Sequence, residues 1–111
     1  MSNYYESNDL KKFGEIGRHA KGLADDFFKY YANATGTDSA LSKREKALIA
    51  LAVSHALKCP YCIDAYTTQC LETGANPEQM MEAVHVAAVM QAGITLVHSV
   101  QMSNHLDKLV A

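Results

Sequence analysis

The stretch that most constrains the fold is a seven-residue apolar run near the middle of the chain, from Ala47 to Val53. It follows Ser42-Lys43-Arg44-Glu45, the pattern of a capping box, with the serine at N-cap and the glutamate at N3. The run is rich in Ala and Leu and poor in β-branched residues, so it predicts a helix over 43–58 rather than a buried strand. A helix that is apolar on every side is expected to be buried within a larger structure.

The rest of the chain shows the three- and four-residue spacing of apolar side chains that is typical of amphipathic helices. This spacing predicts further helices over residues 10–17, 22–34, 60–73, 77–91 and 94–109. Glycines 36, 74 and 93 stand where helices are expected to end or kink. No stretch predicts a strand or a hairpin. We therefore expect an all-α fold of about six helices, in a single domain spanning 1–111 with an irregular segment over 1–8.

Composition and charge exclude several classes of partner. The chain has 111 residues and a formal net charge of −2, with no basic block that would attract nucleic acid. Its polar, acidic start does not resemble a secretory signal, and no apolar run approaches the ~18 residues that a membrane span needs. We expect a cytoplasmic protein that binds neither nucleic acid nor membrane.

One apolar region exceeds what a single small core can use. The stretch 80–100 is rich in Met, Ala and Val and carries few charges. Together with the apolar central helix, it offers more hydrophobic surface than one core of this size needs. Self-association would cover the surplus, so the pattern predicts a homo-oligomer.

The chemistry is concentrated in Cys59-Pro60-Tyr61-Cys62. Proline suits the first position of a helix, which places Cys59 at N-cap and Cys62 in the first turn. Free backbone N–H groups and the helix dipole favour the thiolate there, so the pair is predicted to be a redox-active dithiol. His55 lies one turn before Cys59, and its imidazole is expected to point toward the dithiol and exchange protons with it. The candidate catalytic residues are therefore Cys62, Cys59 and His55, with no cofactor and no metal.

Two other interpretations of the cysteines were weighed. A zinc site would take His55, Cys59 and Cys62 as three ligands, but the candidates for a fourth form no second close pair: Cys70, His85, His98 and His105. The tetrapeptide is also typical of glutaredoxins, which require a βαβ setting that is absent here. Tyr66, four residues after Cys62, could either donate a hydrogen bond to it or pack. Cys70 is expected to be a buried hydrophobe.

The segment 44–68, REKALIALAVSHALKCPYCIDAYTT, resembles the AhpD-like, or carboxymuconolactone decarboxylase, family. Gly74-Ala75 and the stretch 82–93 agree with it. Within the family, Ser54-His55-Ala56 followed by CPYCIDAYT is similar to the peroxidase-like proteins associated with arsenosugar biosynthesis.

The resemblance implies an all-helical protein that assembles as a homo-oligomer, a trimer or a hexamer. It also implies a peroxiredoxin-type (alkyl hydroperoxide) oxidoreductase, which reduces a small hydroperoxide and is itself reduced by a dithiol protein. Carried over, Cys62 is the thiol that attacks the peroxide and Cys59 the thiol that resolves the sulfenic acid.

The sequence departs from the family at three positions. Ala47 stands where AhpD has a Glu, and Tyr61 and Tyr66 stand where it has His. The usual proton relay is therefore absent, which leaves His55 as the substitute. The alternatives are a carboxymuconolactone decarboxylase-like lyase, whose branch does not rely on the dithiol, or a zinc- or partner-binding module that uses the same cysteines.

Overall fold

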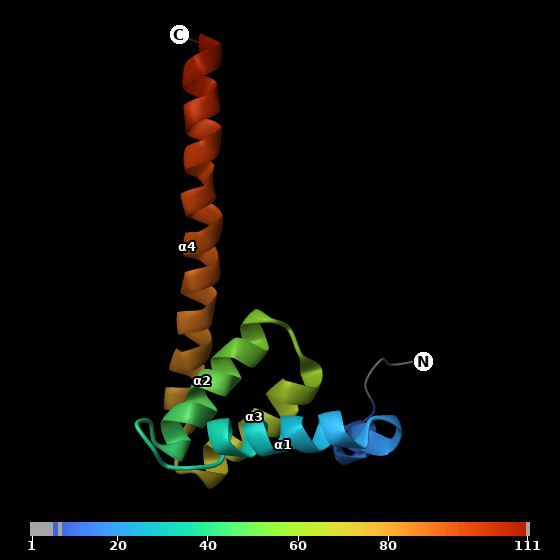
Figure 1. Cartoon of the computed structure of the whole chain (residues 1–111). Helices are drawn as coiled ribbons and strands as arrows, with labels where there is room; N and C mark the ends of the chain where they lie inside the picture. Colours follow the sequence, from blue (N-terminus) through green and yellow to red (C-terminus); the bar gives the residue numbers. More distant parts are fainter. Residues whose placement is uncertain (1–5, 7, 111) are drawn as a thin grey trace.

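The computed structural model describes residue 6 and residues 8–110, so most of the segment expected to be irregular lies outside the described residues. The described chain is entirely helical, without strands, which confirms the all-α prediction. A 3-10 helix is followed by four α-helices: η1 Asp9–His19, α1 Lys21–Thr35, α2 Lys43–Ala56, α3 Pro60–Glu72 and α4 Pro77–Val110. Figure 1 shows η1 and α1–α3 gathered at one end of the molecule, with α4 rising away from them.

The number of helices differs from the expected six because α4 runs without interruption through Gly93. An interior glycine costs about 1 kcal/mol relative to alanine but does not by itself break the hydrogen-bond ladder. No proline follows Gly93 in the chain, and the two residues before it, Gln91 and Ala92, are good helix formers. The two predicted helices over 77–91 and 94–109 are therefore one.

The start of α2 is the predicted capping box. The backbone N–H of Glu45 donates to Oγ of Ser42 at 3.1 Å, and the backbone N–H of Ser42 donates to Oε1 of Glu45 at 2.9 Å. These bonds give Glu45 a structural role. They fix where α2 begins, and so the phase with which its side chains reach the neighbouring helices.

Two successive helices, α2 and α3, end in the same kind of turn. The N–H groups of Lys58 and Cys59 donate to the carbonyls of residues 55 and 54, the paired bonds of a Schellman motif. Gly74 and Ala75 repeat the pattern at the end of α3. The left-handed position is a glycine in the second turn, with φ of 95°, but a lysine in the first, where Lys58 has φ of 56°. The turn before Cys59 therefore holds a backbone conformation that side chains rarely adopt.

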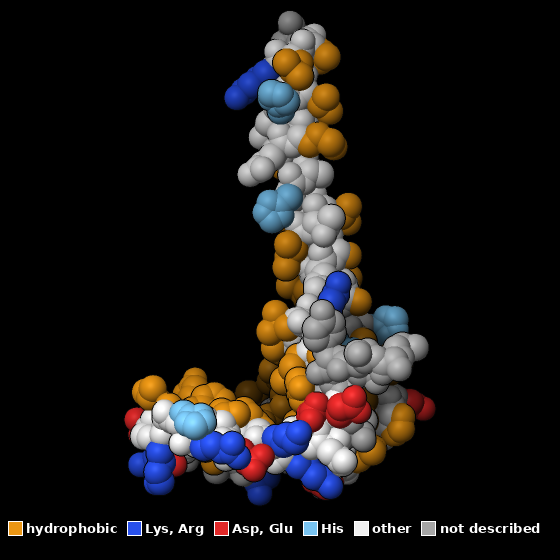
Figure 2. Space-filling model, turned by 90° about the vertical axis from the view of Figure 1, so that its right-hand side faces the viewer, with side chains coloured by type: hydrophobic (Ala, Val, Ile, Leu, Met, Phe, Trp, Pro, Cys, Tyr) orange, Lys and Arg blue, Asp and Glu red, His pale blue; other side chains and the backbone are white. Residues whose placement is uncertain are grey.

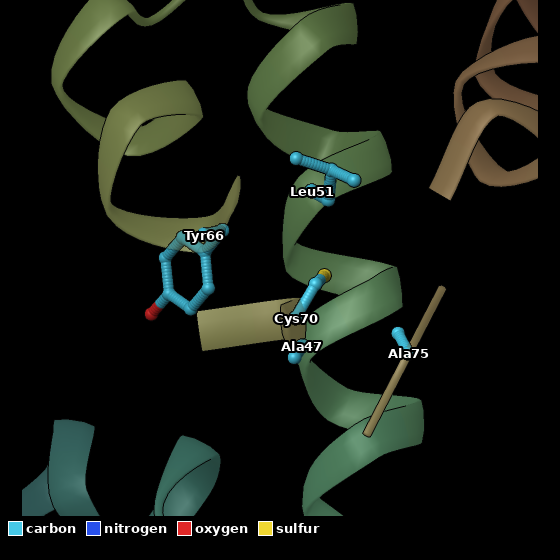
Figure 3. Packing of buried hydrophobic residues seen from close by; sticks show 5 residues of the cluster. All are labelled: Ala47, Leu51, Tyr66, Cys70 and Ala75. Atoms are coloured by element: carbon cyan, nitrogen blue, oxygen red, sulfur yellow. The ribbon is translucent and has the colours of Figure 1, made fainter. Parts of the chain in front are cut away.

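The core is small and lies where α2 and α3 meet. It comprises five buried residues, which Figure 3 shows packed between the ribbons: Ala47, Leu51, Tyr66, Cys70 and Ala75. Cys70 is 0% exposed, as expected for a buried hydrophobe. The expectation that α2 is buried all round is not met within one chain, because Ile49 and Val53 are 51% and 48% exposed.

The helix η1 packs on α1 through aromatic rings. Phe13 makes edge-on contacts with Phe27 and Phe28, at centroid distances of 5.9 and 5.1 Å. Gly17 permits the approach, because a Cβ built there would lie 2.8 Å from Cβ of Ala24. η1 also contacts α3, and residues of η1 line the same cavity as the two cysteines.

The outer part of α4 makes little contact with the rest of the chain. The whole of α4, 34 residues, spans about 50 Å. Every residue of its outer part, from Gln91 to Val110, is exposed. Nε2 of Gln91 donates to the carbonyl of Ala56 at 2.9 Å, the outermost bond from α4 to the other helices among those found in the described chain. Figure 2 shows apolar side chains along this helix, interspersed with histidines.

The apolar character of α4 exceeds what the sequence pattern predicted. Its most apolar 18-residue window has a mean hydropathy of 1.5, so its length and composition alone would allow it to cross a membrane. Twelve of its large apolar side chains are exposed: Met81, Val86, Val89, Met90, Ile94, Leu96, Val97, Val100, Met102, Leu106, Leu109 and Val110. The single chain leaves this apolar surface exposed to solvent, which is unusual for a soluble monomer.

Candidate functional site

The two cysteines of the C-x-x-C lie together at the start of α3. Cys59 is the N-cap residue, Pro60 is the first helical residue, and the backbone N–H of Cys62 donates to Sγ of Cys59 at 3.3 Å. The two Sγ atoms are 2.8 Å apart, and both thiols are free. Because a disulfide needs a separation of about 2.05 Å, a small movement of either side chain would close it.

The two sulfurs have opposite electrostatic environments. The pKa of Cys59 is lowered, first by the hydrogen bond from the Cys62 side chain and then by the Cys62 backbone N–H. Burial raises the pKa of Cys62 to about 11, with the hydrogen bond and charge of Cys59 acting in the same direction. The two groups titrate together, and the first negative charge of the pair therefore resides mainly on Cys59.

Both cysteines open onto an apolar cavity of about 530 Å³ between η1, α1 and α3. Aromatic and aliphatic side chains dominate its wall, which is formed by Asp9, Leu10, Lys12, Phe13, Ile16, Phe27, Tyr31, Cys59, Tyr61, Cys62, Ala65 and Tyr66. The two charged side chains of that wall pair with each other, Nζ of Lys12 lying 3.3 Å from Oδ1 of Asp9. A cavity of this kind suits an organic molecule with a sizeable apolar part.

His55 does not line this cavity. Its Nδ1 lies 2.8 Å from the carbonyl of Leu51, one turn back on its own helix. Its ring borders a separate hollow together with Lys58, Pro60, Ile63 and Asp64. His55 and the two cysteines thus border different hollows, and the expected approach of the imidazole to the dithiol stays a prediction. A catalytic role for His55 stays a prediction.

Two polar residues outside the predicted catalytic set contribute to the surroundings of Cys62. Ser54 is 4% exposed and donates from Oγ to the carbonyl of Ala50 at 2.5 Å. The single hydroxyl proton can serve either that carbonyl or Cys62, and when directed to Cys62 it lowers the pKa of that thiol, against the larger effect of burial. The second residue is Tyr31 of α1, whose hydroxyl is hydrogen-bonded to that of Tyr66. The only sequence signal for Ser54 was its place in the Ser54-His55-Ala56 motif, and nothing local in the sequence pointed to Tyr31.

The zinc interpretation finds no support from the described side chains, since no three His, Cys, Asp or Glu residues among them are arranged to hold a metal ion. Of the candidate fourth ligands, Cys70 is buried in the core, and the three histidines are exposed along α4: His85, His98 and His105. The two cysteines are thus placed together without further ligands from those parts of the chain.

The comparison with protein families identifies the chain. The model of the carboxymuconolactone decarboxylase family matches residues 22–104. The chain belongs to this family. A carboxymuconolactone decarboxylase family protein from Legionella pneumophila has a crystal structure with a similar fold, at a TM-score of 0.65 and 25% identity over 85% of this chain and 90% of that one. The chain is also 40% identical to "Uncharacterized protein 4 in cox locus" of Paracoccus denitrificans, over 86% of each protein.

Membership of the carboxymuconolactone decarboxylase family confirms the broader resemblance, while the narrower similarity to arsenosugar-associated proteins stays a prediction. The three departures from the AhpD pattern now have positions in the fold. Ala47 and Tyr66 belong to the same buried cluster, and Tyr61 borders the cavity. Tyr66 therefore occupies the cavity wall together with Cys62, at a position where AhpD has an imidazole.

Proposed function

We propose that this protein is a thiol-dependent peroxidase of the alkylhydroperoxidase type, which cycles Cys59 and Cys62 between dithiol and disulfide. The observation that carries the proposal is the pair of sulfurs 2.8 Å apart in the wall of an apolar cavity. A dithiol at a helix start can supply both electrons of a peroxide reduction. The cavity provides room for the organic part of a hydroperoxide beside it.

The reaction has two steps on the protein. The thiolate of Cys62 attacks the terminal oxygen of R–O–OH, an S–O bond forms as the O–O bond breaks, and the leaving RO⁻ takes up a proton to become ROH. Cys59 then attacks the sulfur of the Cys62 sulfenic acid, which closes the disulfide and releases water. A dithiol protein restores the pair by exchange through a mixed disulfide.

Because the first negative charge of the pair resides mainly on Cys59, Cys62 must lose its proton before it can attack the peroxide. Because burial raises the pKa of Cys62 and lowers its share of the first charge, attack by Cys62 requires the shared proton to move to Cys59. The 2.8 Å contact between the sulfurs allows that transfer directly. Cys62 is partly buried and packs against the core cluster, so the resulting nucleophile is only partly exposed to water.

Single-turnover oxidation tests the proposal. Fully reduced protein is mixed with tert-butyl hydroperoxide without a reductant, and intact mass reports the loss of two hydrogen atoms as the disulfide forms. We expect Cys62→Ser to abolish the reaction, and Cys59→Ser to stop at a sulfenic acid that dimedone traps. Cys70→Ala is the matched control, since that thiol lies in the core, and it should react as the wild type does.

The outcomes separate the alternatives. Equal peroxide consumption by Cys62→Ser and wild type would contradict the peroxidase, and a sulfenic acid trapped on Cys59 would reverse the order of the two thiols. Turnover of a small carboxylated lactone by a variant that lacks both thiols would favour the lyase. Stoichiometric zinc in the purified protein would favour the metal-binding module.

We also propose that second copies of the chain cover α4, as expected for a homo-oligomer. The helix carries polar side chains, among them Gln91, His98 and Gln101, within its apolar length. Such groups can be hydrogen-bonded between packed protein helices but are expensive in a lipid bilayer. Sedimentation of the purified protein without detergent tests this. We expect a discrete oligomer that Val97→Glu dissociates, and a monomer, or a requirement for detergent, would contradict it.

A further inference from the structure

A pair of tyrosine hydroxyls lies in the cavity that holds the cysteines. Tyr31 of α1 and Tyr66 of α3 are 35 residues apart in the sequence, and their hydroxyl groups are hydrogen-bonded to each other. Tyr66 is only 8% exposed, whereas Tyr31 is half-buried. Figure 3 shows the Tyr66 ring beside α2 with its hydroxyl directed away from Leu51 and Cys70. The ring is therefore part of the core, while its polar end belongs to the cavity wall.

The position of Tyr66 relative to Cys62 follows from helix geometry. The two residues are four apart on α3, so they lie on the same face of the helix, and both line the cavity. The pKa of Tyr66 is raised, first by burial, then by the hydrogen bond and charge of Tyr31, and also by the charge of Cys62. The phenol therefore stays protonated over the pH range in which the cysteine pair first ionises.

The proposed reaction needs a proton at this place. A thiolate that reduces an alkyl hydroperoxide expels an alkoxide, which is too basic to leave efficiently without a proton donor. His55 borders a different hollow, and the ammonium of Lys12 is paired with Asp9. The Cys59 thiol, which receives the proton of Cys62, keeps that proton for the water released in the second step. Tyr66 lines the same cavity as Cys62, and its hydroxyl is bonded to a residue that is more exposed than itself.

We propose that Tyr66 is the catalytic proton donor to the leaving oxygen, and that Tyr31 is a positioning residue that orients the Tyr66 hydroxyl and returns a proton to it. This inference rests on the proposed peroxidase function. The Cys62 thiolate, ROOH and the Tyr66 phenol give the Cys62 sulfenic acid, ROH and the Tyr66 phenolate. The phenolate then regains its proton through the Tyr31 hydroxyl, which is resupplied from solvent.

The competing explanation is that the hydrogen bond only ties α1 to α3. The leaving group of the oxidant distinguishes the two. tert-Butyl hydroperoxide releases an alkoxide, which needs a proton, whereas peracetic acid releases acetate, which does not at neutral pH. A structural role would affect both oxidants alike, since it acts on the fold or on the position of Cys62.

The experiment compares single-turnover oxidation of wild type and Tyr66→Phe by these two oxidants. We expect Tyr66→Phe to lower the rate of oxidation by tert-butyl hydroperoxide about 100-fold, the usual size of a general-acid contribution. With peracetic acid, its rate should stay within about twofold of the wild-type rate. Tyr31→Phe should show the same selectivity with a smaller loss. Tyr30→Phe is the matched control, because Tyr30 is the adjacent residue of α1 and is 72% exposed.

The outcomes separate this inference from the function on which it rests. Equal losses with both oxidants, or no loss with either, would overturn the role of Tyr66 while leaving a Cys62-dependent peroxidase intact. Failure of the wild type to reduce either oxidant through Cys62 would overturn both. Thermal unfolding of each variant is measured alongside, and a selective loss in a fully folded variant supports the proton donor.

Discussion

The cysteine pair has two sides, and they differ in almost every physical respect. On one side lies the apolar cavity, lined by η1, α1 and α3, with Tyr31 and Tyr66 in its wall. On the other lies an open hollow bordered by His55, Lys58 and Asp64. His55 is near the pair in sequence and Tyr31 is far from it, yet Tyr31 shares the cavity with the sulfurs and His55 does not. Nearness along the chain is thus a poor guide to which polar groups serve a site at a helix start.

The largest effect should come from removing the partner that stabilises the Cys59 thiolate. Because the hydrogen bond from the Cys62 side chain is the main cause of the lowered pKa of Cys59, Cys62→Ala should raise that pKa. The rate of Cys59 alkylation by iodoacetamide should therefore reach its half-maximal value at a higher pH than in wild type. His55→Ala is the control from the open side. An unchanged midpoint in Cys62→Ala would show that the helix start alone activates Cys59.

Widening the cavity should weaken the binding of apolar substrates. A Cβ at residue 17 would lie 2.8 Å from Cβ of Ala24, so Gly17→Ala should push η1 away from α1 and withdraw apolar contacts worth about 1–2 kcal/mol from the substrate. We expect an increase of roughly tenfold in KM for an aromatic hydroperoxide and little change for hydrogen peroxide. Gly22→Ala is the control, since nothing lies within 4 Å of that position. Equal effects on both peroxides would argue against a substrate role for the cavity.

A substitution in the turn between α2 and α3 should increase the stability of the protein. Lys58 holds a left-handed conformation that costs a non-glycine residue about 1–2 kcal/mol, and the greater chain entropy of glycine offsets part of that. Lys58→Gly should therefore raise the free energy of unfolding by up to about 1 kcal/mol, as measured in urea. Gly74→Ala, at the matching position after α3, should lower it. A destabilised Lys58→Gly would mean that the lysine side chain makes a contact that outweighs the strain.

The smallest effect is expected at His55. The side chain borders the hollow away from the sulfurs, so His55→Ala should change the peroxide rate by no more than about twofold, which is typical of substitutions outside special sites. Steady-state turnover with a dithiol reductant and peroxide measures it. A large loss would return His55 to the mechanism and would imply that association of chains brings it to the cavity.

Much of the fold could be predicted from local patterns. The capping box at Ser42, the N-cap at Cys59 and the glycine turn at residue 74 all depend on a few adjacent residues, and the structure places them as expected. The continuity of α4 could not be predicted in this way, because a lone glycine is compatible with either a break or a helix.

The site was predictable only in part. The cysteine pair could be predicted because two cysteines three residues apart at a helix start lie within one turn, whatever the rest of the fold. Its surroundings depend on how η1 and α1 fold back onto α3, which decides that Tyr31 meets Tyr66. That His55 borders a separate hollow could not be predicted, because the Schellman turn at Lys58, with a lysine where glycine is usual, gives almost no signal in the sequence.

The exposed outer half of α4 ties the order of this helix to the amount of protein present. Most helical stability in proteins comes from tertiary packing, and every residue from Gln91 to Val110 is exposed in the single chain. If second copies cover the helix as proposed, its amide hydrogens should exchange slowly in concentrated solution and rapidly on dilution, while those of the core around Leu51 change much less. The two ends of the same molecule would then have different stabilities, one fixed by the chain and the other by its concentration.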